Sequence, residues 1–375
     1  MRSIPTVRAT PIPSLNGFRL VAASWIFLFH WQDTLRGYIP AGWRGPASQV
    51  LVRLLDQGYV AVSALFVLSG FVLAYNYPRP LRSGERGRFY VARFARIYPG
   101  HLLALAIGAP LFIARALRGL RAPTAGDVAS YVTLTSAWMP DKVFAIQDPG
   151  WATSAVAFFY LAYPVLIAAM AGRTRRGLLA LAAAVWAAAL IAPAAFVALR
   201  AVDGDGSTAA LFVRYDPLLR LGEFAFGMAV GLWWARDRRA LPALAAPLAL
   251  VAWFALAVAP VPRMLLHNGL LAPVLAVLLV ALAGGRGVLP RALSWRPVAS
   301  LGEAGFGIFI LQVPMFWTVE AVQKLLGQPP RTGASFVATL ALTLLAASLS
   351  LRWLERPAQR AIKAAYGHLH AAPPL

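Results

Sequence analysis

The sequence predicts an all-α integral membrane protein, a polytopic bundle of about ten transmembrane helices. Three observations indicate this class. Of the 375 residues, 59% are hydrophobic and only 13% are charged, and the mean hydropathy is +0.65. A water-soluble domain of this composition could not cover its own surface with polar groups. Finally, apolar runs of about 20 residues, long enough to cross a bilayer, recur along the chain.

The apolar runs define the expected spans, which are joined by short loops. They lie near residues 16–35, 58–77, 98–117, 151–171, 178–199, 217–235, 240–260, 266–284, 300–324 and 333–353. The segment DVASYVTLTSAWM, between the third and fourth runs, is apolar but short, and we interpret it as a half-buried or re-entrant piece. We expect a single integral-membrane domain over residues 1–375, with no appended soluble domain.

The charge is strongly basic, with a formal net charge of +21. In a soluble protein this would suggest nucleic acid as a partner. In a membrane protein, Lys and Arg gather in cytoplasmic loops and set the orientation. If the N-terminus is cytoplasmic, 21 of the 35 Lys and Arg residues fall in inner segments and 13 in outer ones. The sequence therefore predicts a multi-pass protein of the inner (cytoplasmic) membrane, with both termini cytoplasmic and no nucleic-acid partner.

Arg19 and His30 lie inside the first apolar segment, LNGFRLVAASWIFLFH. Ionisable side chains are costly at bilayer depth, so those that persist there are candidates for function. A spacing of eleven residues is close to three helical turns, which puts both side chains on one face, roughly 16 Å apart along the axis. The pair could be a fixed cation and a general base on one track. Alternatively, Arg19 snorkels to the interface and His30 hydrogen-bonds to a neighbouring helix.

The segment RFYVARFARIYP places Arg88, Arg93 and Arg96 just before the third span. Arg93 and Arg96 are three residues apart and are therefore neighbours on a helix face. Such a pair could clamp phosphate groups at the cytoplasmic mouth of the bundle. A positive-inside anchor, or a contact with anionic lipids, is the alternative.

Polar and small residues inside other spans favour packing. Ser69 lies mid-way along the second span beside a glycine, and no base is paired with it in the sequence. Arg220 and Glu223 are spaced to pair within a helix, and Gly227 and Gly231 are spaced as a helix-packing face.

Glu303 and Gln312 are further polar groups in an apolar span, each able to reach a buried partner. The chain has no cysteine, which excludes disulfides and thiolate chemistry, and its five histidines show no metal-ligand spacing. The sequence therefore predicts no metal site.

Taken in order, these segments resemble the membrane acyltransferase-3 family, multi-pass enzymes that transfer acyl groups, often acetyl, from acyl-CoA to sugars and other acceptors. The resemblance covers nearly the whole chain. The matching strings are LNGFR…FH, FVLSGFVLAY, RFYVARFARIYP, W…SAVAFFYLAYP from Trp151 to Pro164, PLLRLGEF…G, LGEAGFGIFILQVP and LERP at 354–357. Each string is weak alone, but their ordered co-occurrence is specific.

The resemblance implies roles for particular residues. His30 would be the catalytic base and Arg19 a CoA or active-site ligand. Arg93 and Arg96 would contact the CoA phosphates, and we add Arg88 and Ser69 to this cofactor-binding set. The implied activity is that of an integral-membrane O-acyltransferase. It would hold no permanent cofactor, take acyl-CoA (expected to be acetyl-CoA) as co-substrate, and acylate a hydroxyl of a carbohydrate or glycolipid acceptor within the lipid bilayer.

The chain departs from the family pattern at four positions. Asn16 stands where the family often has Asp, Gln312 where His is common, and His101 where an aromatic residue is common. The fourth-span motif usually carries a Glu five residues after its Trp, and here that position is Val156. If that carboxylate orients the histidine or the acceptor, this protein uses another acid, has a different acceptor, or is catalytically weak.

Two other functions stay open at this point. Intramembrane Arg and His also suit a transporter or flippase of an anionic or glycolipid substrate, although the chain shows no internal repeat. The second alternative is a catalytically degenerate paralogue that binds acyl-CoA without turnover. The presence of Val156 in place of the family Glu suggests it.

Overall fold

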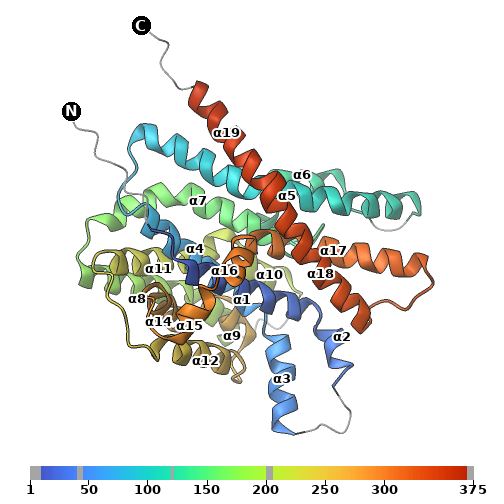
Figure 1. Ribbon diagram of the computed structural model, residues 1–375, viewed down its shortest axis with the longest axis horizontal. Helices are drawn as coiled ribbons and strands as arrows, with labels where there is room; N and C mark the ends of the chain where they lie inside the picture. The colour runs from blue at the N-terminus through green and yellow to red at the C-terminus, as the bar shows by residue number, and fades with distance from the viewer. Residues whose placement is uncertain (1–9, 40–44, 120–121, 200–205, 370–375) are drawn as a thin grey trace.

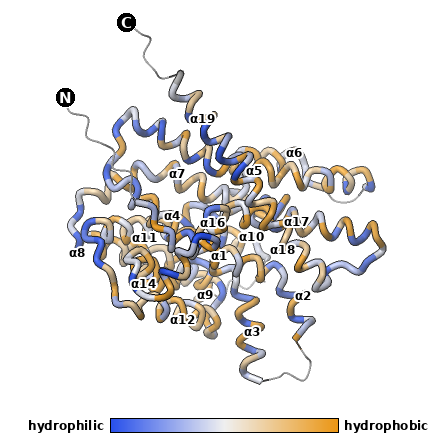
Figure 2. The backbone as a smooth tube through the Cα atoms, in the orientation of Figure 1, coloured by the Kyte–Doolittle hydropathy of each residue, from blue (hydrophilic) through white to orange (hydrophobic). Residues whose placement is uncertain are grey.

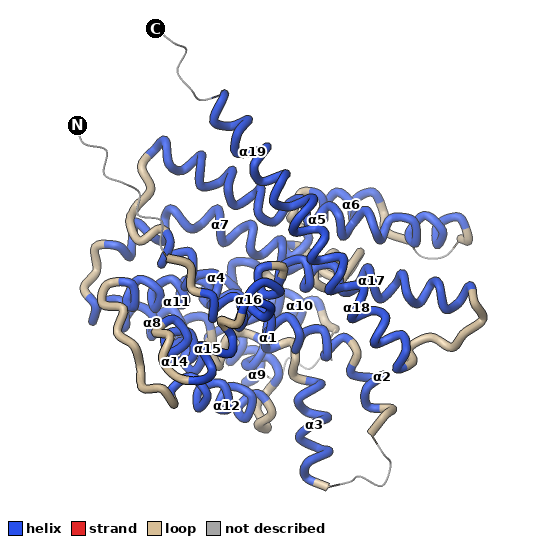
Figure 3. Tube along the Cα trace, viewed as in Figure 1, coloured by secondary structure: helices blue, strands red, loops and turns tan. Residues whose placement is uncertain are grey.

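The computed structural model describes residues 10–39, 45–119, 122–199 and 206–369. Within these ranges every regular element is a helix, and no strand is present (Figure 3). The predicted all-α class is therefore confirmed.

The helices succeed one another along the chain with short connections. In order they are α1 (Pro13–His30), α2 (Gln32–Arg36), α3 (Pro46–Asp56), α4 (Val60–Asn76), α5 (Ser83–Leu117), α6 (Ala125–Val132), η1 (Ser136–Trp138), α7 (Gly150–Ala171), α8 (Arg175–Ala189), α9 (Ile191–Ala198), α10 (Thr208–Tyr215), α11 (Pro217–Ala235), α12 (Ala245–Ala257), α13 (Arg263–His267), α14 (Ala272–Ala283), α15 (Val288–Leu293), α16 (Arg296–Glu303), α17 (Gly305–Leu325), α18 (Gly333–Leu349), the π-helical turn η2 (Ser350–Glu355) and α19 (Arg356–Leu369).

Six helices of the described chain are long and apolar enough to cross a membrane, or seven if the bent pair α3–α4 counts as one span. A helix covers each of the ten apolar runs, but α1, α11 and α12 are not among the helices that are long and apolar enough to cross. α12 has 13 residues, which is about 20 Å of helix against a hydrocarbon core of about 30 Å. α1 and α11 have sufficient length, but Arg19, His30, Arg220 and Glu223 lower their mean hydropathy.

The outer surface of the bundle is apolar, as lipid contact requires. Leu161 and Val165 of α7 are 61% and 73% exposed, and Val251 of α12 is 65% exposed. Figure 2 shows mostly hydrophobic colour along the middle of the long helices and hydrophilic colour towards many of their ends. The chain is therefore a polytopic helical membrane protein.

Close helix contacts set the core of the bundle. A Cβ added to Gly70 of α4 would lie 2.0 Å from the carbonyl oxygen of Phe224 on α11, and one added to Gly227 would lie 2.0 Å from that of Val67. Only glycine allows the two backbones to approach so closely. The predicted packing face on α11 is confirmed, and it holds α4 against α11 in the middle of the molecule (Figure 1).

The long helix α5 brings the basic segment to this core. Its 35 residues correspond to about 50 Å of helix, more than a bilayer needs. α5 contacts α7 and α17, and α19 crosses α5 near the chain's end (Figure 1). Its arginines therefore lie beside α7 and α17, which carry the aromatic and polar residues discussed below.

Candidate active site

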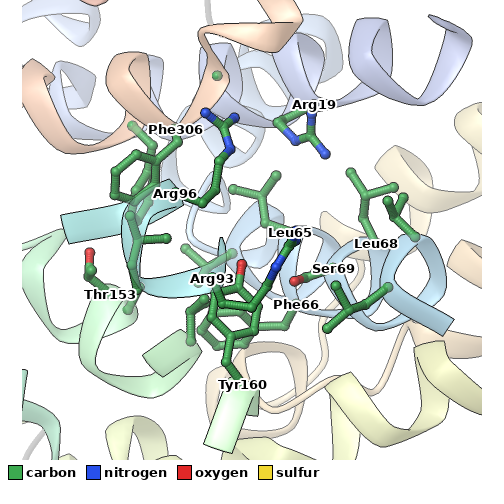
Figure 4. Close-up of a pocket in the computed structure, with 18 residues that line it drawn as sticks. Arg19, Leu65, Phe66, Leu68, Ser69, Arg93, Arg96, Thr153, Tyr160 and Phe306 are labelled. Atoms are coloured by element: carbon green, nitrogen blue, oxygen red, sulfur yellow. The ribbon is translucent and has the colours of Figure 1, made fainter. Parts of the chain in front are cut away.

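An arginine cavity, named here for Arg19, Arg93 and Arg96, lies between α1, α4, α5, α7 and α17. It encloses about 920 Å³ of empty space, including the part open to solvent. Figure 4 shows the three guanidinium groups entering the same region from two helices, with Ser69 beside Arg93. The structure thus brings together four of the predicted site residues.

Arg96 is fixed by a buried carboxylate. Its Nη1 donates to Oε2 of Glu355 at 3.1 Å, and its Nη2 donates to the carbonyl oxygen of Glu303 at 3.1 Å. Glu355 is 1% exposed and also accepts a hydrogen bond from Ser350 at 3.1 Å. Both residues belong to the π-helical turn η2, a type of distortion that is frequent at functional sites. The turn therefore serves to orient Arg96 towards the cavity.

Arg93 is held by aromatic rings instead of by acids. Its guanidinium carbon lies 5.8 Å from the ring centres of Tyr77 and Phe89 and 5.9 Å from that of Tyr160. No carboxylate of the described chain lies within ion-pair distance of it, and its buried Nε has no hydrogen-bond partner there. Aromatic rings stabilise a cation without neutralising it, so Arg93 keeps its full charge for a ligand.

Arg19 is likewise left charged. Its Nη1 donates to Oδ1 of Asn16 at 2.8 Å, and Asn16 is neutral where the family often has an acid. A Cβ on Gly305 of α17 would lie 2.8 Å from Cγ and Cδ of Arg19, so the glycine makes room for this side chain. Arg19 and Arg96 are near enough to repel each other. The cavity thus concentrates three positive charges, which the nearby carboxylates of Glu355 and Glu303 only partly offset, and this is a setting for an anion.

Other candidate residues occupy distinct places. Ser69 lines the cavity, and its hydroxyl has no hydrogen-bond partner among the described residues. Val156 lines it too, where the family often has Glu. Arg88 is exposed on α5 and does not line the cavity. A role for Arg88 in binding stays a prediction.

A second space, the histidine cavity, contains His30 and encloses about 900 Å³, again including open solvent. Its polar lining consists of His30, Asp148, Arg214, Arg263 and His267. Its apolar lining is largely aromatic: Phe29, Tyr59, Phe144, Trp151, Tyr215 and Phe309. Sequence reasoning missed every polar member except His30, because these residues come from separate segments and share no spacing.

The hydrogen bonds of Gln312 define which nitrogen of His30 is free. Nε2 of Gln312 donates to the carbonyl oxygen of Phe309 at 2.8 Å, so its Oε1 must face His30, whose Nδ1 lies 3.1 Å away. An amide oxygen only accepts, so Nδ1 of His30 carries the proton. Neutral His30 therefore has its lone pair on Nε2, as a general base requires.

His267 has the opposite arrangement. Nη1 of Arg220 donates to its Nδ1, so the proton of a neutral ring resides on Nε2. Arg220 is fully buried and pairs with Glu223 at 2.9 Å, which confirms the predicted pairing, and it donates to Ser63 at 3.1 Å. His267 also stacks on Tyr59 with ring centres 5.5 Å apart. The histidine cavity thus has one imidazole able to accept a proton and one able to donate a hydrogen bond.

The loop that carries Asp148 is secured by Tyr131 of α6. Its hydroxyl donates to the carbonyl oxygens of Val143 at 2.7 Å and Gln147 at 3.1 Å. Burial raises the pKa of Tyr131, so the phenol remains protonated and able to donate. α6 lies in the segment that the sequence predicts to be half-buried, and its helix positions an acid at the histidine cavity.

The two cavities adjoin. Val62 of α4 and Phe309 of α17 line both of them. Arg19 and His30 both belong to α1, but they line different cavities. The single track expected from their spacing is therefore divided at Val62 and Phe309. Val156 shares its cavity with Arg19 and not with His30.

No group of three or more His, Asp or Glu side chains in the described part of the chain is arranged to hold a metal ion.

Comparison with known proteins adds independent information. A family model described as "Acyltransferase domain" matches residues 12–351. Acyltransferase MdmB of Streptomyces mycarofaciens is 26% identical over 379 residues, which cover 94% of this chain and 93% of that protein. Protein 2 in picA locus of Rhizobium radiobacter is 40% identical over 111 residues, covering 29% of this chain and 50% of that protein. No solved structure matches the chain with significance.

Proposed function

The chain belongs to the membrane acyltransferase-3 family, and from this premise we propose that it transfers an acyl group from acyl-CoA to a hydroxyl of a sugar or glycan. Acetyl-CoA is the proposed donor. The observation that carries the proposal is the adjoining of two cavities with different chemistry. One concentrates three guanidinium groups, of which Arg19 and Arg93 have no carboxylate partner among the described residues, and the other holds a histidine whose Nε2 is free.

The arginine cavity is the proposed donor site. Arg93 and Arg96 contact phosphate oxygens of CoA, because guanidinium groups suit phosphate geometry and charge. Arg19 lines the same cavity and Ser69 offers an unpartnered hydroxyl, so both suit the polar arm of CoA. With both termini cytoplasmic in the inner membrane, this cavity opens to the cytoplasm, where acyl-CoA is available.

The histidine cavity is the proposed acceptor site. Nε2 of His30 removes the proton from the acceptor hydroxyl as its oxygen attacks the thioester carbonyl. The carbon–sulfur bond then breaks, and the CoA sulfur receives the proton from His30. Asp148 opposes the positive charge that forms on the imidazole, and Nε2–H of His267 is a donor for an acceptor oxygen.

The lining of the histidine cavity favours a sugar as acceptor. Aromatic rings give flat apolar surfaces for the C–H face of a pyranose, and the interspersed charged groups can hydrogen-bond to its hydroxyls. The orientation of His30 by Gln312 also favours catalysis over degenerate binding, since the amide oxygen accepts from Nδ1 and leaves Nε2 free to take a proton.

Two measurements test the proposal. Purified protein should release CoA thiol from acetyl-CoA, and the release should increase when cell-envelope glycans are added. Mass spectrometry of those glycans, from cells with and without the protein, should show one acyl mass lost in its absence. A protein that releases no thiol and changes no glycan mass would exclude the acyl transfer proposed here.

A further inference from the structure

Val62 and Phe309 form the boundary between the arginine cavity and the histidine cavity. They are the only two of the described residues that line both spaces, and each is 7% exposed. One side chain comes from α4 and the other from α17, so two helices meet the boundary from different parts of the chain. Because both side chains are apolar, the boundary offers no partner for a phosphate or a charged group.

Phe309 is connected to His30, the proposed base, through the hydrogen bonds of Gln312. The carbonyl oxygen of Phe309 accepts from Nε2 of Gln312 at 2.8 Å, and Oε1 of the same amide holds Nδ1 of His30 at 3.1 Å. Phe309 and Gln312 are one turn apart on α17. The backbone that places the Phe309 ring therefore also places the amide that orients His30.

The geometry points to Val62 and Phe309 as the passage through which the acyl group reaches His30, and as the pair that limits its size. This inference rests on the proposed function. CoA phosphates held at the arginines stay in the first cavity, so only the acyl end can meet an acceptor in the second. An apolar passage bounded by a phenyl ring suits a short, unbranched acyl group, and a longer or branched chain would have to displace a buried side chain.

The effect of such a limit on rate is large enough to measure. One additional methylene in a confined apolar site changes specificity by roughly 10- to 200-fold. Replacing Phe309 by a small residue should therefore shift the preference between acetyl-CoA and longer donors by at least about tenfold per excluded carbon.

The experiment compares thiol release from acetyl-, butyryl- and hexanoyl-CoA by the detergent-purified, full-length protein. We expect Phe309→Ala and the milder Phe309→Leu to raise the rate with hexanoyl-CoA relative to acetyl-CoA. Val62→Ala should act in the same direction from the other side of the passage, and Val62→Ile should lower the rate with butyryl-CoA relative to acetyl-CoA.

Matched controls exist on α11. Phe226 and Val230 are each 5% exposed, similar to Phe309 and Val62, and line neither cavity. Phe226→Ala and Val230→Ala should leave the chain-length profile unchanged, which separates passage width from general loosening of the bundle. If the wild type is active but the passage variants keep its profile, the passage assignment is wrong. If the wild type releases no thiol from any donor, the proposed function fails and the passage with it.

Discussion

The arginine cavity and the histidine cavity differ in how their positioned cations are partnered. In the first, Arg19 is paired with a neutral amide and Arg93 with aromatic rings, so positive charge is left for a ligand. In the second, the buried cation Arg220 behind the cavity wall is matched by Glu223, and the nearby groups direct individual protons. In the proposed function, this difference separates attraction of the donor from proton transfer, on the two sides of Val62 and Phe309.

Replacing His30 should have the largest effect. His30→Ala should reduce acyl transfer by about 10² to 10⁴-fold, the contribution usual for a general base, while binding of acyl-CoA is retained. The measurement is the transfer rate together with acyl-CoA affinity for protein recovered from the membrane. Transfer should also decline in acid, because a protonated imidazole cannot accept a proton. Undiminished turnover in His30→Ala would remove the histidine cavity from the chemistry.

Replacing the cavity arginines should affect binding more than chemistry. Arg93→Ala and Arg96→Ala should each raise the KM for acyl-CoA by roughly 10- to 100-fold, since a charged hydrogen bond contributes about 1.5–3 kcal/mol. Affinity of the wild type should decrease as salt increases. Initial rates at varied acyl-CoA concentration measure the KM, and isothermal titration at several salt concentrations measures the affinity.

Two further variants sharpen the arginine test. Arg88→Ala is the natural comparison, because Arg88 is on the same helix but outside the cavity. Arg96→Ala alone would leave the buried acid Glu355 without its ion-pair partner, and combining it with Glu355→Gln removes that unpaired charge. Normal CoA binding by both cavity variants, with altered insertion only, would favour the anchoring interpretation of this segment.

Removing the amide that orients His30 should have an intermediate effect. Gln312→Leu should lower kcat about tenfold, because Nδ1–H loses its acceptor and Nε2 is no longer fixed in direction. The KM for acyl-CoA should be unchanged. In combination with His30→Ala, the Gln312→Leu change should cause no additional loss of rate. An additive loss in the double variant would show that Gln312 acts independently of His30.

The smallest effect concerns the stability of α7. Val156→Glu should be tolerated better than Val165→Glu, because Val156 faces the three cavity arginines whereas Val165 is 73% exposed on the outer surface. An acid facing lipid costs on the order of 2–3 kcal/mol at the helix centre, and pairing with the arginines offsets much of that cost. Thermal unfolding midpoints and expression yields of the two variants are the comparison. Greater damage from Val156→Glu would contradict the placement of α7 at the arginine cavity.

The arginine cavity was more accessible to sequence reasoning than the histidine cavity, for a physical reason. Arg93 and Arg96 follow helical spacing on one helix, and Arg19 is recognisable as a charged residue inside an apolar span. The structure places these three residues and Ser69 in one cavity. Asp148 and His267 are brought to His30 by a loop and a short helix, and their neighbourhood depends on tertiary packing alone.

The fold was predictable at the level of class and helix location, but not in the number of spans. Periodic apolar composition locates helices well, yet it cannot show that α12 is too short to cross or that α1 and α11 carry their polar residues inward. The two residues that lower the mean hydropathy of α1, Arg19 and His30, are the same residues that line the two cavities.

The position of Val62 and Phe309 between the two cavities has an electrical consequence. Where hydrated cavities approach from both faces, the transmembrane voltage falls mainly across the short apolar layer between them. In the proposed reaction, a proton moves inward from the acceptor to the CoA sulfur, while the acyl group, formally a cation, moves outward to the acceptor oxygen, so no net charge crosses that layer in a turnover. Because a potential acts only on net charge moved, at about 2.3 kcal/mol per elementary charge per 100 mV, the membrane voltage should neither drive nor oppose the acylation of an external hydroxyl, and the extent of acylation should be the same in an energised membrane as in detergent.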